Sequence, residues 1–270
     1  LIEGRSKLFL NRERVLPDKA NISIFNPTLP EIYLDMILGW DGTNSKERLA
    51  EFRERGYFHS VVNPNATSYF FAHLGAEEKE QVRGSAHVIS DDYFVGVEDM
   101  GSTTRIKLSS GGHIDYEKEV IIVNCRTSSS ESRSGYLFDV HPIRPDGSVS
   151  FGGLLGASGS TNYKYTLAHT QGPQVYDTLG MYGFKHTYVD RTIDEDYVLQ
   201  FMLKGMANTL SLMEVLSPED MKSDTLEQSR WFPFFRRLYA AVKINRARDQ
   251  IFEMADVHLR RLTPGDQQPD

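Results

Sequence analysis

The sequence predicts an α+β protein: a mixed, largely antiparallel sheet with N-terminal helices and a C-terminal helical segment. Three observations predict this class. Apolar residues recur at helical spacing near the N-terminus, short strand-like runs separated by turn residues fill the middle, and helical spacing returns after residue 191. Hydrophobic residues make up 40% of the chain and charged residues 25%, which is ordinary for a globular protein and excludes disordered and collagen-like classes.

The chain length suits one large domain or two small ones. The segment Ile2-Glu3-Gly4-Arg5 is a protease recognition sequence used to remove affinity tags, so we treat residues 1–5 as a tag remnant. The remainder is predicted to divide into a strand-rich α/β domain over 6–190, a C-terminal helical segment over 191–262 that packs on it, and a tail over 263–270.

Two helices are expected between residues 30 and 56. Pro30 suits a first helical turn, and the Asp41-Gly42 pair ends the first helix. Asn44 or Ser45 can cap the second, because their short polar side chains accept hydrogen bonds from free backbone N–H groups. A strand over 58–62 and a helix over 76–82 are predicted to follow.

The middle of the chain is predicted to supply six to eight strands, mostly joined by short loops. The β-branched run at 120–123 is typical of a strand buried on both faces. Arg144-Pro145-Asp146-Gly147 has turn chemistry, since proline presets φ and glycine accepts positive φ. The expected strands cover 93–97, 104–108, 120–123, 136–140, 148–155, 163–167 and 184–189.

Three helices are predicted after residue 191. Thr192-Ile193-Asp194-Glu195 is a capping box that opens an apolar helix ending near Leu216, and Ser217-Pro218 signals a second start. A third helix is predicted from Pro233 to Leu262. Its apolar stripe is expected to pack on the core while the basic residues lie on a solvated flank, and docking to a partner or a membrane surface is the alternative. The stripe comprises Phe235, Leu238, Tyr239 and Val242, and the flank includes Arg236 and Lys243.

Charge and cysteine content narrow the class of partner and compartment. The net charge of −7 makes nucleic acid an unlikely partner. The single cysteine excludes an intramolecular disulfide and fits a reducing compartment, either a cytoplasm or a host cytoplasm into which the protein is delivered. No stretch qualifies as a membrane span, and no motif implies a metal or organic cofactor.

The strongest candidate for chemistry is the pair formed by Cys125 and His141. Each follows a predicted strand, and neighbouring strands can bring a thiol within hydrogen-bond reach of a base. Arg126 would favour the thiolate, while Thr127 and Ser128 would lie near a developing oxyanion and the substrate.

Residues 123–141 resemble the Cys-to-His hairpin of the cysteine glutamine-deamidase superfamily, which includes the chemoreceptor deamidase CheD and the cytotoxic necrotizing factor toxins. Cys125 and His141 are the positions that match. The resemblance implies a hydrolase that deamidates a glutamine side chain of a target protein, with the thiol as nucleophile and the imidazole as base and acid. It also implies a catalytic fragment of a bacterial effector or toxin with a role in virulence.

Other readings of the same residues stay open. His169 or His186 could serve as a more distant base, as in papain-like enzymes. Cys125 could instead be a small buried hydrophobic residue with no chemical role. The alternative function is a non-enzymatic interaction or assembly module, viral, phage or bacterial, that docks a protein partner through its loops and the basic aromatic C-terminal helix.

Overall fold

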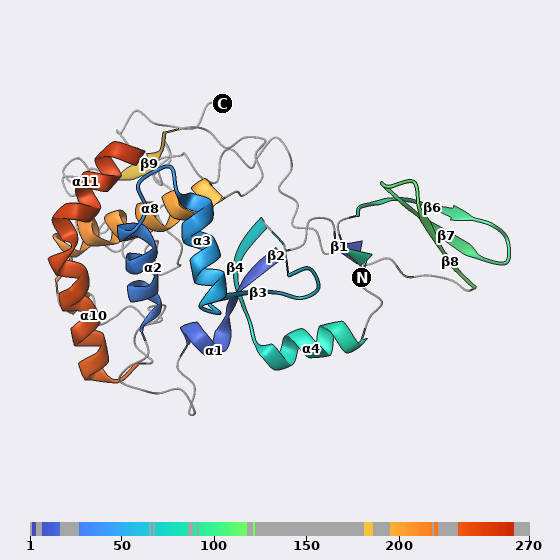
Figure 1. The fold of residues 1–270 in the computed structure, drawn as a ribbon, viewed down its shortest axis with the longest axis horizontal. Helices are drawn as coiled ribbons and strands as arrows, with labels where there is room; N and C mark the ends of the chain where they lie inside the picture. Colours follow the sequence, from blue (N-terminus) through green and yellow to red (C-terminus); the bar gives the residue numbers. More distant parts are fainter. Residues whose placement is uncertain are drawn as a thin grey trace. The chain divides into compact units, whose positions relative to one another are not determined.

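The computed structural model describes residues 2–3, 7–16, 27–64, 66, 68–85, 89–90, 92–117, 121, 181–185, 195–217, 219–220 and 232–261. Helices and small mixed and antiparallel sheets in these ranges confirm the predicted α+β class (Figure 1). The chain separates into unit 1, Leu1–Arg12 with Phe58–Ser128, and unit 2, Glu13–Tyr57 with Ser129–Asp270. The strands predicted at 120–123, 136–140, 148–155 and 163–167 lie outside the described residues, apart from position 121.

One sheet of unit 1 is built around β2 (Lys7–Asn11), a strand that the sequence patterns did not predict. It pairs antiparallel with β3 (Phe58–Ser60), within the predicted strand, and parallel with β4 (Ser68–Leu74). The side chains of Leu8 and Leu10 are buried, as the two-residue period of a half-buried strand requires. Helix α4 (Ala76–Ser85) confirms the helix predicted over 76–82.

Two short elements complete the N-terminal part of the chain. Helix α1 (Arg12–Val15) directly follows β2. In unit 1, β1 (Ile2–Glu3) pairs in parallel with β5 (Ile89–Ser90), so two residues of the expected tag remnant form one strand of this pair.

The second sheet of unit 1 is the antiparallel meander of β6 (Phe94–Asp99), β7 (Thr104–Leu108) and β8 (His113–Tyr116) (Figure 1). Strands β6 and β7 confirm the predictions at 93–97 and 104–108. Both turns contain a glycine with φ of +85°. The carboxylate of Asp92 accepts hydrogen bonds from Ser110, Ser109 and the Tyr93 N–H. These bonds tie the second turn to the start of β6. They also hold the pKa of Asp92 well below its ordinary value.

Helix α8 (Glu195–Met213) is the centre of unit 2. Helices α2 (Leu29–Leu38), α3 (Ser45–Glu54) and α11 (Arg248–His258) and strand β9 (Tyr182–Phe184) all contact it. Most residues of α8 are buried, including Lys204, whose Nζ lies 4.2 Å from the ring centroid of Phe184. The N-terminal helices α2 and α3 thus pack directly on the helix predicted to open after residue 191.

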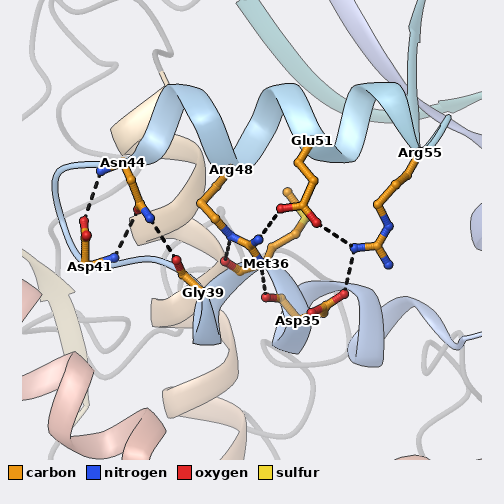
Figure 2. A network of polar contacts seen from close by, with 8 residues as sticks. All are labelled: Asp35, Met36, Gly39, Asp41, Asn44, Arg48, Glu51 and Arg55. Atoms are coloured by element: carbon orange, nitrogen blue, oxygen red, sulfur yellow. Dashed lines mark hydrogen bonds and ion pairs between the residues drawn. The ribbon is translucent and has the colours of Figure 1, made fainter.

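Polar contacts hold α2 against α3 (Figure 2). The last carbonyl groups of a helix have no partner within it, and here Arg48 of α3 donates to the carbonyls of Asp35 (2.6 Å) and Met36 (3.5 Å). Asn44 donates to the Gly39 carbonyl at 3.0 Å. A β-carbon at Gly39 would lie 2.4 Å from the Arg48 guanidinium carbon, so glycine permits this approach.

The prediction of one continuous helix from Pro233 to Leu262 is wrong. The structure has α10 (Phe234–Arg246), a break at Ala247, then α11 and the strand β10 (Leu259–Arg261). Strand β10 pairs antiparallel with β9. A strand was predicted over 184–189, and β9 shares only Phe184 with it. Asn208 of α8 holds β9 in place, since its amide accepts from the Tyr182 N–H (2.7 Å) and donates to the Tyr182 carbonyl (3.1 Å). Tertiary pairing of this kind outweighs helix propensity.

Candidate functional site

The residues predicted to carry chemistry lie outside the described residues. They are Cys125, Arg126, Thr127, Ser128, His141, His169 and His186. The Cys-His site therefore stays a prediction. The candidate site that can be built from described side chains is helix α10.

Helix α10 is oriented opposite to the prediction. Its stripe of apolar residues was expected on the core, but the buried residues of the helix are Arg236 and Ala240. Arg236 was expected on the solvated flank and is 8% exposed. The sequence correctly implied two dissimilar faces, and the structure reverses which of them is inward.

An acidic residue on α2 explains the reversal. Glu31, only 2% exposed, lies 2.5 Å from the Arg236 guanidinium, measured from Oε2 to Nη2. The same Glu31 oxygen accepts hydrogen bonds from the N–H (2.8 Å) and the hydroxyl (2.9 Å) of Thr28, which closes a capping box at the start of α2. A buried carboxylate needs a paired charge, and Arg236 supplies it only when its side of α10 faces α2.

We call the opposite side of α10 the outer stripe. Its five side chains are between 42% and 79% exposed, and Phe235 is the most exposed of them. Scattered exposed apolar residues are ordinary, whereas a contiguous exposed patch marks an interaction site. In Figure 1, α10 lies at the edge of unit 2. The outer stripe consists of Phe234, Phe235, Leu238, Tyr239 and Val242.

Cations flank the outer stripe. Lys243 and Arg246 are exposed, Arg237 is half-buried, and no acidic residue occurs between 234 and 248. Among the described carboxylates, none lies within ion-pair distance of Lys243 or Arg246. The outer side of α10 therefore combines apolar and cationic character in a chain whose net charge is −7.

A second polar cluster of unit 2 joins α3, α8 and α11. The buried Ser45 hydroxyl accepts from Trp40 Nε1 at 2.8 Å and donates to Asp196. The Trp40 ring lies against His258, with 4.4 Å between ring centroids. Burial, followed by the charge of Lys185, lowers the pKa of His258, and Asp41 opposes this shift. The Ser45 hydroxyl thus ties α3 to Trp40 and to the first turn of α8.

A further exposed apolar region occurs on the β6–β8 meander. Phe94, Val95 and Val97 of β6 are all exposed. Acidic and basic side chains lie among them on neighbouring strands, including the ion pairs Arg105–Asp115 and Lys107–Glu98. This sheet lacks the single charge sign that distinguishes α10.

The described residues offer neither a cluster of metal ligands nor a membrane-spanning helix. No group of three or more His, Cys, Asp or Glu side chains in the described ranges is placed to hold a metal ion. None of the described helices is long and apolar enough to cross a membrane.

No protein-family model matches the chain, and searches of curated proteins and of solved structures also return no match.

Proposed function

We propose that this chain is a non-enzymatic interaction module that docks a partner through the outer stripe of α10. The observation that carries the proposal is the orientation of this helix, which buries an arginine and presents five large apolar side chains to solvent. Burying apolar surface is the main driving force of association, and aromatic residues and arginine are enriched at interfaces.

Unfolding experiments test whether the stripe serves binding and not folding. The double variant Phe235→Ser/Leu238→Ser is expected to keep the wild-type free energy of unfolding within about 1 kcal/mol, because both side chains are largely exposed. Ile251→Ala on α11 is the matched control, since Ile251 is fully buried and its truncation should cost about 2–5 kcal/mol. The proposal fails if the double variant unfolds as readily as Ile251→Ala.

Association experiments test the docking itself. A photo-reactive phenylalanine analogue at position 235 is expected to cross-link to whatever covers the stripe, including a second copy of the chain. The same analogue at Val257, which is 57% exposed on the neighbouring helix, serves as the control position. Equal cross-linking from both positions would contradict a specific docking face.

The cysteine-dependent amidohydrolase is a separate proposal that rests on the sequence of Cys125 and His141. Its test is intact-mass measurement of candidate protein targets after incubation with the wild type and with Cys125→Ser. Deamidation of a glutamine adds about one mass unit, and proteolysis gives fragments. If Cys125→Ser keeps both the fold and the cellular effect of the wild type, the enzyme proposal fails.

A further inference from the structure

We infer that the partner of the outer stripe is an anionic lipid surface, on which α10 lies as an interfacial helix. This inference rests on the proposed docking function and specifies the chemistry of the partner. An interfacial helix inserts an apolar face at the boundary of headgroups and acyl chains while cations contact the headgroups. The described residues of α10 supply both parts.

The apolar part covers a wide arc of the helix. At about 100° per residue, the five stripe residues span roughly 140° of the helix circumference. Val242 lies nearest the middle of this arc, with Leu238 and Phe235 on either side of it, and Phe234 and Tyr239 lie at its edges. The rings of Phe234 and Phe235 meet edge to face, with centroids 5.7 Å apart. Tyr239 adds a ring with a polar end, which suits a position at the headgroup boundary.

The cationic part lies on both sides of this arc. On the same helical projection, Lys243 lies beyond one edge of the stripe and Arg237 beyond the other. Arg246 falls inside the arc, near the edge on the Lys243 side, in the last turn of the helix. Long basic side chains can extend from such positions to headgroup phosphates while their methylene groups stay against apolar surface. No carboxylate occurs from 234 to 248 to repel an anionic surface.

Shape and charge favour a lipid surface over a folded protein. The exposed stripe residues all belong to one helix. A fluid bilayer adapts to a single convex helix, whereas a folded partner needs a complementary groove. The overall charge of −7 opposes binding to anionic lipid at long range. Attraction therefore depends on the local cations of α10 together with insertion of its apolar side chains.

Vesicle binding of the full chain tests the inference. Flotation is measured with vesicles of phosphatidylcholine alone and of phosphatidylcholine with about 30% phosphatidylserine. Each basic residue near an anionic surface contributes about a factor of five, so the three cations should favour the anionic vesicles by roughly 100-fold. Added salt should weaken the binding, because screening shortens the range of the attraction.

Three variants separate the contributions. Lys243→Gln/Arg246→Gln should weaken binding to anionic vesicles by roughly 30-fold. Phe235→Ser/Leu238→Ser should weaken it by roughly 100-fold, because two large side chains no longer insert. Val257→Ser removes an exposed apolar residue outside the stripe and should bind as the wild type does. Denaturant unfolding of each variant verifies that it is folded.

The outcomes distinguish this inference from the proposed function. Anionic-selective binding that both double variants lose supports the lipid surface. If neither vesicle binds while the stripe mediates self-association or captures an acidic helical peptide, the lipid inference is overturned and the docking function stands. If neither vesicle binds and the stripe variant unfolds like a core variant, both proposals fall.

Discussion

Arg236 of α10 and Glu31 of α2 form a buried ion pair that fixes which side of α10 faces the protein. Removing one partner of such a pair leaves an uncompensated buried charge, which costs about 3–5 kcal/mol. We expect Glu31→Ala to lower the free energy of unfolding by this amount, with the loss of the Thr28 capping box adding to it. Denaturant titration followed by circular dichroism measures the change.

The exposed ion pair between Arg55 and Glu51 provides the control for this prediction. Glu51 is 47% exposed, and its pairs with Arg55 and Arg48 are both formed along α3, so Glu51→Ala should cost about 1 kcal/mol or less. The double variant Glu31→Gln/Arg236→Met should recover part of the stability, because neither site then holds an unpaired charge. Equal losses for Glu31→Ala and Glu51→Ala would show that the buried pair does not hold α10.

The hydroxyl of Ser45 connects the indole of Trp40 to the carboxylate of Asp196. Ser45→Ala leaves the Trp40 N–H without its acceptor in a buried position, and we expect a loss of about 1–3 kcal/mol. Thr43→Ala is the control, since it removes only an exposed hydrogen bond to Asp41. Wild-type thermal stability of Ser45→Ala would argue against the tie between α3 and α8.

Gly42 combines positive φ with a close approach to another helix. Its φ is +89°, and a β-carbon there would lie 2.5 Å from Cε1 of His258. Gly42→Ala should therefore destabilise unit 2 through backbone strain of about 1–2 kcal/mol plus a steric clash.

Gly56 isolates the backbone part of this effect. It lies in the same unit with φ of +80°, and its β-carbon would meet the nearest atom of Arg14 at an ordinary 3.6 Å. The stability loss of Gly56→Ala should therefore reflect backbone strain without a steric clash. Gly42→Ala should lower the free energy of unfolding more than Gly56→Ala does. This difference should shrink when His258 is also replaced by alanine, and an unchanged difference would rule out the His258 ring as its cause.

The lowered pKa of His258 predicts a pH dependence of stability. In the unfolded chain this histidine takes up a proton near pH 6.5, whereas in the folded protein burial and Lys185 delay protonation to lower pH. Between these values the unfolded state binds more protons, so the free energy of unfolding falls as the pH falls from about 6.5 through the folded pKa.

Two measurements check this prediction. Nuclear magnetic resonance titration should give His258 a pKa below 6.5, with His258→Gln used to assign its signal. The same substitution should flatten the unfolding free energy between about pH 5 and 7. Some slope should persist, because burial and Arg12 also lower the pKa of His73 in unit 1. A His258 pKa at or above 6.5 would contradict the packing described for its ring.

The elements that the sequence predicted well are those whose boundaries are set by residues next to them in the chain. Pro30 and the Asp41-Gly42 pair place α2 within one or two residues, because they act on the backbone next to them. The break at Ala247 has no such signal, as alanine favours helix. Strand β10 likewise depends on pairing with β9, which is distant in sequence.

The orientation of α10 shows a second limit. The period of apolar residues defines two faces of a helix, and burial preferences assign the apolar face to the core. Here a buried acid on α2 determines the assignment, and no pattern within 233–246 reveals it. One signal was available: the basic run without a single acid, which indicated a docking face as the alternative to a solvated flank.

The central position of α8 has a consequence for biosynthesis. Helices α2 and α3 emerge from the ribosome early, but the surface on which they pack begins only at Glu195. At a translation rate of about 5–20 residues per second, the apolar faces of α2 and α3 stay uncovered for roughly ten to thirty seconds before α8 has been synthesised. During translation, chaperone access to α2 and α3 thus becomes part of how this protein reaches its native state.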